Sequence, residues 1–248
     1  MEKRNTQQRG QIKMKTALFT IQNLSAWYCP KKTVLSDFSL ELAEHEVVGM
    51  VGLNGAGKTT FLKVLSGLLP SFQAEGIWLH NDSIELRGRD FKTSRYTVFA
   101  EDNSFSYFTF WEYISYVFAA YQKELPDVTQ LIQGFHFEAY TDTLLKDLST
   151  GNRKKVFLIT AFALQTKLLF LDEPVNGLDF QSTEYLYQQI VKYKEVGTVL
   201  FSSHILESIS LTSDRVLVLE NGKIRQALEH EQIKSAEIRE VLHYENAV

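Results

Sequence analysis

The stretch that decides the fold is Val47-Val48-Gly49-Met50-Val51-Gly52-Leu53-Asn54-Gly55-Ala56-Gly57-Lys58-Thr59-Thr60. An apolar segment of strand length leads through a glycine-rich turn into an amphipathic segment of helix length at 59–69. Glycines let backbone N–H groups turn inward beside the positive N-terminus of the helix, which makes a cradle for phosphate oxygens. We therefore predict a phosphate loop, and a glycine-rich turn without a ligand is the alternative. The residues predicted to bind the phosphates are Gly52, Asn54, Gly55, Ala56, Gly57, Lys58, Thr59 and Thr60.

Two side chains of this loop have distinct expected roles. Lys58 is expected to reach the β- and γ-phosphates, and the Thr59 hydroxyl is placed to ligate Mg²⁺. The helix that follows is expected to be anchored in the core by Phe61, Leu62, Leu65 and Leu68. The motif alone leaves kinases, GTPases, helicases and transport ATPases open. No aspartate is followed three residues later by glycine, so the sequence argues against the switch segment of a small GTPase.

Composition narrows the class of protein further. The 248 residues carry a formal net charge of −4, which argues against a protein that mainly neutralises nucleic-acid phosphates. The single cysteine, Cys29, leaves no internal disulfide, and no Cys/His cluster has zinc spacing, so we expect a reducing compartment, the cytosol. The apolar run 156–164 is far shorter than the roughly 20 residues that span a bilayer. We therefore expect that the chain does not cross a membrane itself.

The order of apolar and amphipathic segments predicts an α/β fold. After residue 50, short β-rich segments alternate with helix-length segments, as in a phosphate-loop NTPase core with a mainly parallel sheet. Apolar/polar alternation at 18–24 and 34–42 predicts an antiparallel β layer at the N-terminus. Further strands are expected at 47–51, 96–100, 168–171, 198–202 and 216–219.

The domain organisation follows from the same reading. Residues 1–17 are predicted to form a flexible tail, with Met14 as a candidate natural start, and residues 18–248 a single domain. The aromatic-rich segment at about 90–149 is predicted to be a helical subdomain inserted in this domain. Its rings serve either core packing or the docking of a partner. Residues 223–248 are expected to finish a strand and add a short charged helix at 231–242.

A second motif is Leu168-Leu169-Phe170-Leu171-Asp172-Glu173-Pro174, an apolar strand that ends in two carboxylates. Such a pair is costly in a core unless a cation or a substrate meets it at the strand edge. Because adjacent side chains on a strand point apart, Asp172 is expected to face the Mg²⁺ held by Thr59. Glu173, kept extended by Pro174, is expected to polarise the attacking water. A strand end capped by two solvated acids is the alternative.

With these motifs the chain resembles the nucleotide-binding domain of the ABC transporter family, over about residues 28–204. The resemblance implies that Asp179, in Asn176-Gly177-Leu178-Asp179, lies in a loop at a dimer interface. It implies that His204, at the end of the segment 197–204, contacts the γ-phosphate. Tyr28, with Trp27 as the alternative, is similar to the aromatic residue of the family that stacks on adenine, and simple sheet packing is the competing explanation.

The segment Leu148-Ser149-Thr150-Gly151-Asn152 partly matches the L-S-G-G-Q signature of that family. The resemblance implies that Ser149, Thr150, Gly151 and Asn152 bind a γ-phosphate across the interface of a head-to-tail dimer. Thr150 and Asn152 depart from the signature and are similar to variants in bacterial exporter ATPases. Glu101 stands where many relatives carry a glutamine that senses Mg²⁺ and the attacking water, so it is an expected metal-site residue.

The resemblance implies a subunit that binds and hydrolyses ATP with Mg²⁺, with Glu173, His204 and Lys58 as catalytic residues. It implies an ATP-dependent homodimer, or a heterodimer with a similar subunit, that energises a separate integral membrane permease, an exporter by its signature. The chain would then lie peripherally on the inner face of the cell membrane, with no nucleic-acid partner expected.

Two other functions are alternatives to that of a transporter subunit. A soluble ABC ATPase acting on DNA or ribosomes is disfavoured because the chain has no long coiled-coil insertion, no second cassette and no basic face. A cassette that binds ATP without hydrolysis is disfavoured because Lys58, Asp172, Glu173 and His204 are all present.

Overall fold

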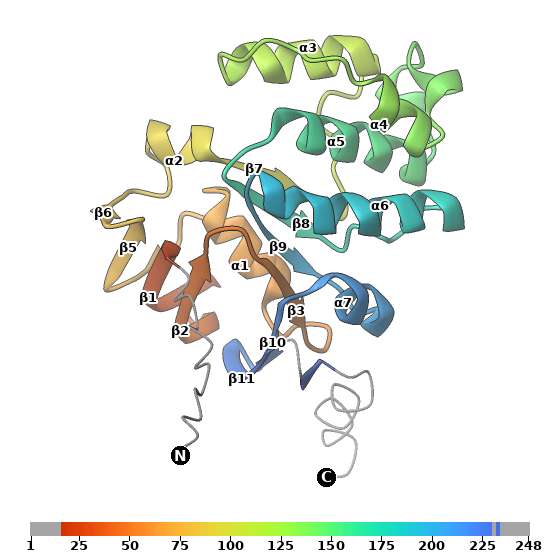
Figure 1. Ribbon diagram of the computed structural model, residues 1–248. Coiled ribbons are helices and arrows are strands. Elements are labelled where there is room, and N and C mark those ends of the chain that lie inside the picture. The colour runs from red at the N-terminus through yellow and green to blue at the C-terminus, as the bar shows by residue number, and fades with distance from the viewer. Residues whose placement is uncertain (1–15, 230–231, 234–248) are drawn as a thin grey trace, which may run out of the picture.

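The computed structural model describes residues 16–229 and 232–233, and its elements form two sheets with helices between and around them (Figure 1). The candidate start at Met14 lies outside the described residues, as does the helix expected at 231–242 apart from 232–233. Strand β1 begins at Ala17, the last residue of the predicted tail. Within the described part of the chain, no helix combines the length and the apolar character needed to cross a membrane.

The central sheet has six strands in the order β11-β10-β3-β9-β8-β7. Its neighbouring strands run parallel from β7 to β10, and β11 alone is antiparallel to its neighbour. This confirms the predicted mainly parallel sheet. The strands are β3 (Val47–Val51), β7 (Arg95–Val98), β8 (Leu168–Asp172), β9 (Thr198–Ser202), β10 (Arg215–Glu220) and β11 (Lys223–Glu229).

Strand β3 and residues 168–171 of β8 are continuously apolar because both faces of the central sheet are covered. Val47 and Val51 belong to the apolar cluster formed with helices α3 to α7. Val48 and Met50 belong to a second apolar cluster, formed with α1 and the antiparallel layer. Every residue of β3, β8 and β9 is buried. A continuous apolar run, rather than alternation, is therefore the sequence pattern of these strands.

The second sheet is the antiparallel layer expected at the N-terminus. Its long strands β1 and β2 pair through a hairpin, and β1 also pairs with β5 and with the short β4. Phe38 of β2 packs on Phe61 of helix α1, with ring centroids 4.4 Å apart, so the helix lies between the two sheets. The strands are β1 (Ala17–Cys29), β2 (Lys32–Ala43), β4 (Phe72–Gln73), β5 (Gly76–Leu79) and β6 (Asp82–Ser83).

Helices α3 to α7 form a separate layer on the other face of the central sheet. Figure 1 shows α5 between the sheet and the outer helix α3, and α5 contacts β7, α3 and α4. The α-helices are α1 (Lys58–Leu65), α2 (Arg89–Ser94), α3 (Phe110–Ala120), α4 (Thr129–Gly134), α5 (Thr150–Leu164), α6 (Phe180–Lys192) and α7 (Leu206–Thr212). Short 3₁₀ helices are η1 (Glu138–Tyr140), η2 (Leu145–Asp147) and η3 (Tyr193–Glu195).

The strand expected at 96–100 is β7, so the segment 90–149 includes one strand of the central sheet. Helices of this segment pack on α5, which follows it in the chain. One detail differs from the sequence-based expectations. Leu68 was expected to anchor α1 but is 63% exposed. The helix ends at Leu65 because Gly67 takes φ 72°, a left-handed conformation that stops a helix and turns the chain away.

Candidate nucleotide-binding and catalytic site

The glycine-rich segment follows the buried end of β3 and opens α1, as the sequence predicted. Gly57 takes φ 106° at the start of the helix, and a Cβ there would lie 2.6 Å from Leu35 Cδ2. Only glycine meets both demands without strain. No side chain caps the first turn of α1, so its N–H groups face the loop. Such a helix start suits the oxygens of an anionic phosphate.

Lys58 lies folded over this loop. Its Nζ donates to the carbonyl oxygen of Gly52 at 2.7 Å and to that of Leu53 at 3.4 Å. Burial lowers the pKa of Lys58, while the charges of Glu173 and Asp172 act in the opposite direction. The structure therefore places the lysine between the phosphate loop and the two carboxylates.

Thr59 and Asp172 meet at the edge of the sheet. Thr59 Oγ1 lies 2.9 Å from Asp172 Oδ2 and 3.1 Å from Oδ1, across two segments far apart in sequence. A hydroxyl and a carboxylate are oxygen ligands that suit Mg²⁺, which usually keeps further positions for water and substrate phosphates. Within residues 16–229 and 232–233, no cluster of three or more His, Cys, Asp or Glu could hold a metal ion by itself. The residues present thus fit a magnesium ion that arrives with a nucleotide.

Glu173 turns away from Asp172 toward the next strand end. Its Oε2 lies 2.8 Å from His204 Nδ1 and accepts a hydrogen bond of 3.2 Å from the His204 backbone N–H. The expected divergence of the two carboxylates is present. The expectation that Pro174 keeps Glu173 extended is wrong, because Glu173 takes φ 47°. A non-glycine residue in this left-handed region is strained, and such strain gathers at functional sites.

Ser202 is a residue of this site that the sequence reading missed. It lies directly opposite Asp172 in the pairing of β8 with β9, and it is fully buried. Its Oγ donates to Asp172 Oδ1 at 2.7 Å and accepts from the Glu173 backbone N–H at 3.0 Å. A polar residue ending an apolar strand, in register with the acidic pair, is the signal that could have identified it.

The signature-like segment opens α5. The Ser149 hydroxyl caps the helix by accepting from the Asn152 backbone N–H at 3.1 Å, and Ser149 and Thr150 are exposed. Gly151 is buried against the loop before α6, where an added Cβ would lie 2.1 Å from the carbonyl oxygen of Gly177. The glycine therefore has a packing role within the chain, in addition to the phosphate contact that the resemblance implies.

Asp179 caps helix α6 in the same loop. It accepts from the backbone N–H of Ser182 at 2.8 Å, from the Ser182 hydroxyl at 2.9 Å and from the buried Lys155 Nζ at 2.7 Å. Burial alone would raise the pKa of Asp179, but these hydrogen bonds outweigh it and hold the pKa well below its usual range. The loop expected at a dimer interface is thus fixed by contacts within the chain.

Glu101 lies on the loop after β7, in a cavity of about 360 Å³ that Lys154 and Asn176 also line. Lys154 extends from α5 to the loop after β8, where it donates to the carbonyl oxygens of Glu173 and Asn176. The charge of Glu101 acts on Lys154 together with those of Asp172 and Glu173. Of the three residues expected at the metal site, Thr59 and Asp172 are hydrogen-bonded to each other. Glu101 lines the same cavity as Lys154.

Tyr28, near the end of β1, lies beside the phosphate loop. Its hydroxyl is 3.4 Å from Thr60 Oγ1, and its ring is 56% exposed. Lys63 Nζ lies 5.9 Å from the centroid of that ring. Trp27, the alternative residue, is partly buried. An exposed ring next to the helix that follows the glycine-rich loop could stack on a base.

Comparisons with known proteins agree with this architecture. The family described as ABC transporter matches residues 35–176. AlbC of Bacillus subtilis, by name an ABC transporter ATP-binding protein, is 35% identical over 219 residues, covering 86% of this chain and 92% of its own length. EcsA of the same organism, an ABC-type transporter ATP-binding protein, is 30% identical and covers 84% and 86%. A solved structure of the ATP-binding subunit of an ABC transporter matches with a TM-score of 0.77 and 25% identity, covering 86% of this chain and 90% of that one.

The fold and the site define a phosphate-loop ATPase, and the chain belongs to the ABC transporter family. Within that family it is an ATP-binding subunit of a transporter and hydrolyses ATP.

Proposed function

We propose that this subunit hydrolyses ATP with Glu173 as the residue that orients and deprotonates the attacking water, and that it powers a separate membrane permease. The observation that carries the proposal is the divergence of two adjacent carboxylates beside the phosphate loop. Asp172 contacts Thr59, and Glu173 contacts His204. One carboxylate is therefore positioned for a cation and the other for a water molecule.

The residues divide the work of phosphoryl transfer. Lys58 leaves its backbone carbonyl partners to bind the phosphates, and the phosphate loop supplies N–H donors. Thr59 and Asp172 would hold Mg²⁺, which supplies charge neutralisation for the phosphates when bound. Glu173 accepts the proton of the water, and His204, whose side chain is 57% exposed, binds the γ-phosphate. Tyr28 stacks on the adenine.

The arrangement of α5 supports the proposal of a dimer. Ser149 and Thr150 are exposed at the N-terminus of a 15-residue helix, where N–H groups and the helix dipole favour an anion. We infer that Ser149, Thr150, Gly151 and Asn152 complete the site of a second copy, or of a similar subunit, with Asp179 and its loop at the interface. ATP then lies between the two subunits and holds them together.

The surface for the permease is the exposed aromatic group on and before α3, which contains Tyr107, Trp111 and Tyr116. Lys146 lies 4.6 Å from the centroid of the Tyr107 ring. Aromatic residues are enriched at protein interfaces relative to the rest of the protein surface. Docking there would place the subunit at the inner face of the membrane. We infer export as the direction, because Thr150 and Asn152 depart from the signature as they do in bacterial exporter ATPases.

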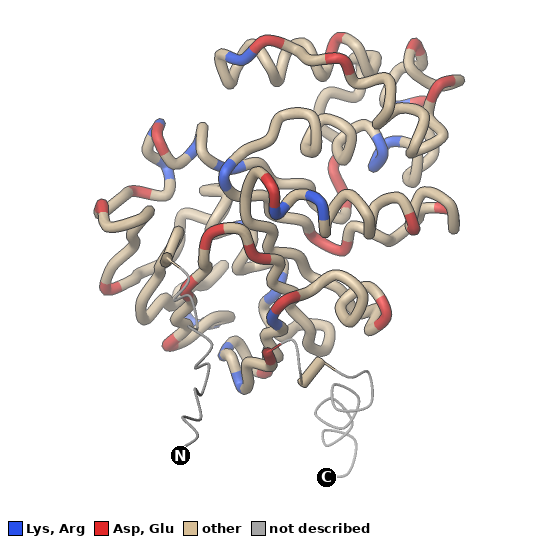
Figure 2. Tube along the Cα trace, in the orientation of Figure 1, with Lys and Arg blue, Asp and Glu red and all other residues tan. Residues whose placement is uncertain are grey.

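Charged residues weigh against the alternative that the subunit acts on DNA or ribosomes. Figure 2 shows Lys and Arg interspersed with Asp and Glu over the described elements, without a continuous basic stripe. A protein that binds the phosphate backbone of a nucleic acid needs clustered Lys and Arg residues on its surface.

The Glu173→Gln variant tests the catalytic proposal. Turnover should fall by about 10²–10⁴-fold, because the amide accepts no proton, while ATP-dependent dimers persist in size-exclusion chromatography. Glu75→Gln, a change at an exposed residue between β4 and β5, should turn over normally. Normal turnover in Glu173→Gln would exclude Glu173 as the base.

The partner is tested by purifying the tagged chain from native membranes and identifying what binds. An integral membrane protein whose recovery is lost in Tyr107→Ser/Trp111→Ser, with ATP binding retained, is the expected result. Recovery with ribosomes or DNA, unaffected by these substitutions, would favour the alternative. Loading of cargo into inside-out vesicles, where ATP is outside, would support export.

A further inference from the structure

Lys154 is a buried lysine for which the proposed reaction has no role. It extends from the first turns of α5 and is 5% exposed. Its Nζ donates to the carbonyl oxygen of Glu173 at 3.0 Å and to that of Asn176 at 2.8 Å. These two carbonyls belong to the turn after β8, which the Asn176 N–H closes on Glu173 O at 3.3 Å. Helix α5 is thus hydrogen-bonded to the turn that carries the proposed base.

Stability alone gives a poor reason for a lysine at this position. A buried ammonium loses its hydration, and apolar residues of similar volume usually stabilise a core as well or better. Burial lowers the pKa of Lys154, and the charges of Asp172, Glu173 and Glu101 raise it. The charges of these three carboxylates, two of which belong to the site, thus offset part of the cost of burying the ammonium group.

The backbone of Glu173 needs such support. Its φ of 47° is a conformation that persists only where several contacts define it. The N–H of Glu173 donates to two oxygens of Ser202. The carbonyl oxygen lies at 3.2 Å and the hydroxyl Oγ at 3.0 Å. Lys154 binds the carbonyl at the other end of the same residue. Together they hold both peptide groups of Glu173.

We propose that Lys154 is a positioning residue for Glu173: its ammonium group fixes the turn Glu173–Asn176 and so sets the place of the carboxylate that activates water. The extra negative charge of Glu101, across the cavity, is balanced by this lysine. The loop after β7 then acts on Glu173 through Lys154. This inference rests on the proposed role of Glu173.

Two substitutions separate the hydrogen bonds from the bulk of the side chain. Lys154→Met keeps the apolar length and removes both donors, so kcat should fall about 10- to 100-fold while KM for ATP changes less than about threefold. Lys154→Gln keeps two N–H donors on a chain one atom shorter and should recover a large part of kcat. A Gln variant no better than Met would overturn the hydrogen-bonded role.

A readout that needs no turnover is the hydrogen exchange of the turn in the nucleotide-free protein. In Lys154→Met the amides of Asn176 and Leu178 should exchange at least about tenfold faster, while those of β8 keep their rates. Unchanged exchange at the turn would contradict the proposal, whatever the activity.

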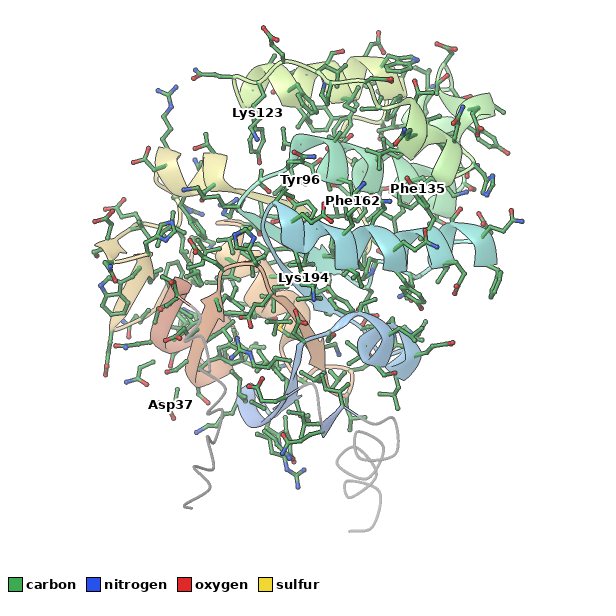
Figure 3. All side chains as sticks on the ribbon, in the orientation of Figure 1. Asp37, Tyr96, Lys123, Phe135, Phe162 and Lys194 are labelled. Atoms are coloured by element: carbon green, nitrogen blue, oxygen red, sulfur yellow. The ribbon has the colours of Figure 1, made fainter. Side chains whose placement is uncertain are left out.

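Lys123 offers a matched control. It too uses one Nζ to bind two backbone carbonyls, those of Leu164 at 2.6 Å and Gln165 at 3.1 Å, at the far end of α5. Figure 3 labels it at the end of α3, in the outer helical layer. Lys123→Met should lower Tm by an amount comparable with Lys154→Met and leave kcat unchanged. Equal losses of kcat in both variants would reduce Lys154 to a structural residue.

The double variant separates this inference from the proposed base. If Lys154 acts through Glu173, then Lys154→Met should cause no further loss of kcat in the Glu173→Gln background. If the losses of kcat from the two substitutions were additive, the positioning role of Lys154 would be contradicted, while Glu173 would remain the proposed base. Full turnover in Glu173→Gln alone would instead overturn the proposed function.

Discussion

The Ser202 hydroxyl donates a hydrogen bond of 2.7 Å to Asp172 Oδ1, between two neighbouring parallel strands. The same oxygen accepts from the Glu173 N–H at 3.0 Å. A single buried serine therefore fixes the carboxylate that meets Thr59 and the backbone of the residue that meets His204. Because Ser202 is fully buried, it acts on the site through Asp172 and Glu173 rather than through a contact with a nucleotide.

The Ser202→Ala variant should turn over ATP about tenfold more slowly and lose about 1–2 kcal/mol of unfolding free energy. Asp172 loses a donor, and Glu173 N–H keeps only the carbonyl of Ser202. Turnover assays and urea denaturation measure the two effects. Thr198→Val removes another fully buried hydroxyl, at the start of β9, which donates to the carbonyl oxygen of Ala43, and should lose stability with normal turnover. The role assigned to Ser202 does not survive if both variants turn over like the wild type.

Asp172→Asn should raise the Mg²⁺ concentration needed for half-maximal turnover by about tenfold or more, because an amide binds a hard cation less well than a carboxylate. Binding of ATP without Mg²⁺ should change little, since Lys58 and the loop remain. Magnesium titrations of turnover and of ATP binding measure this. Asp214→Asn, which alters a pair with Lys194 on the other side of the sheet, is the control. An unchanged magnesium dependence in Asp172→Asn would remove Asp172 from the metal site.

The sequence predicted the elements of this site better than its local geometry. The apolar runs at 47–51 and 168–171 identify buried parallel strands, and parallel strands bring their carboxyl ends to one edge. The meeting of Thr59 with Asp172 follows from that topology and needs no coordinates. The motif residues could therefore be placed near one another from sequence alone.

The backbone of Glu173 could not be predicted in the same way. Pro174 disfavours the right-handed helical region for Glu173, but this leaves both extended and left-handed conformations open. Ser202 and Lys154 select the second, and their contacts depend on strand register and on how α5 packs. Such contacts join residues distant in sequence, and no local pattern marks them. The same is true of Gly151, whose packing on Gly177 is a tertiary contact.

Gly151→Ala tests that packing because two effects oppose each other. Alanine favours a helix over glycine by about 1 kcal/mol. Its Cβ, however, would lie 2.1 Å from the carbonyl oxygen of Gly177, a backbone atom that cannot move without shifting the loop. The clash should win, with a net loss of about 1–3 kcal/mol in urea denaturation. Thr150→Ala, at the exposed neighbouring position, should change stability little. A Gly151→Ala protein more stable than the wild type would show that the loop containing Gly177 moves away from the added Cβ at little cost.

Asp179→Asn should lower Tm by a few degrees at pH 7, and the difference from the wild type should shrink in acid. The asparagine still caps α6 through the Ser182 N–H, but it leaves the buried Lys155 without a charged partner. The pKa of Asp179 is depressed in the folded protein, so its stabilisation is present above the unfolded value of about 4 and is lost as pH falls toward the folded value. The wild type should therefore lose its advantage progressively below about pH 4. Thermal melts of both proteins from pH 7 to pH 3 measure this. A Tm difference that stays constant over this range would show that the charge of Asp179 contributes nothing through Lys155.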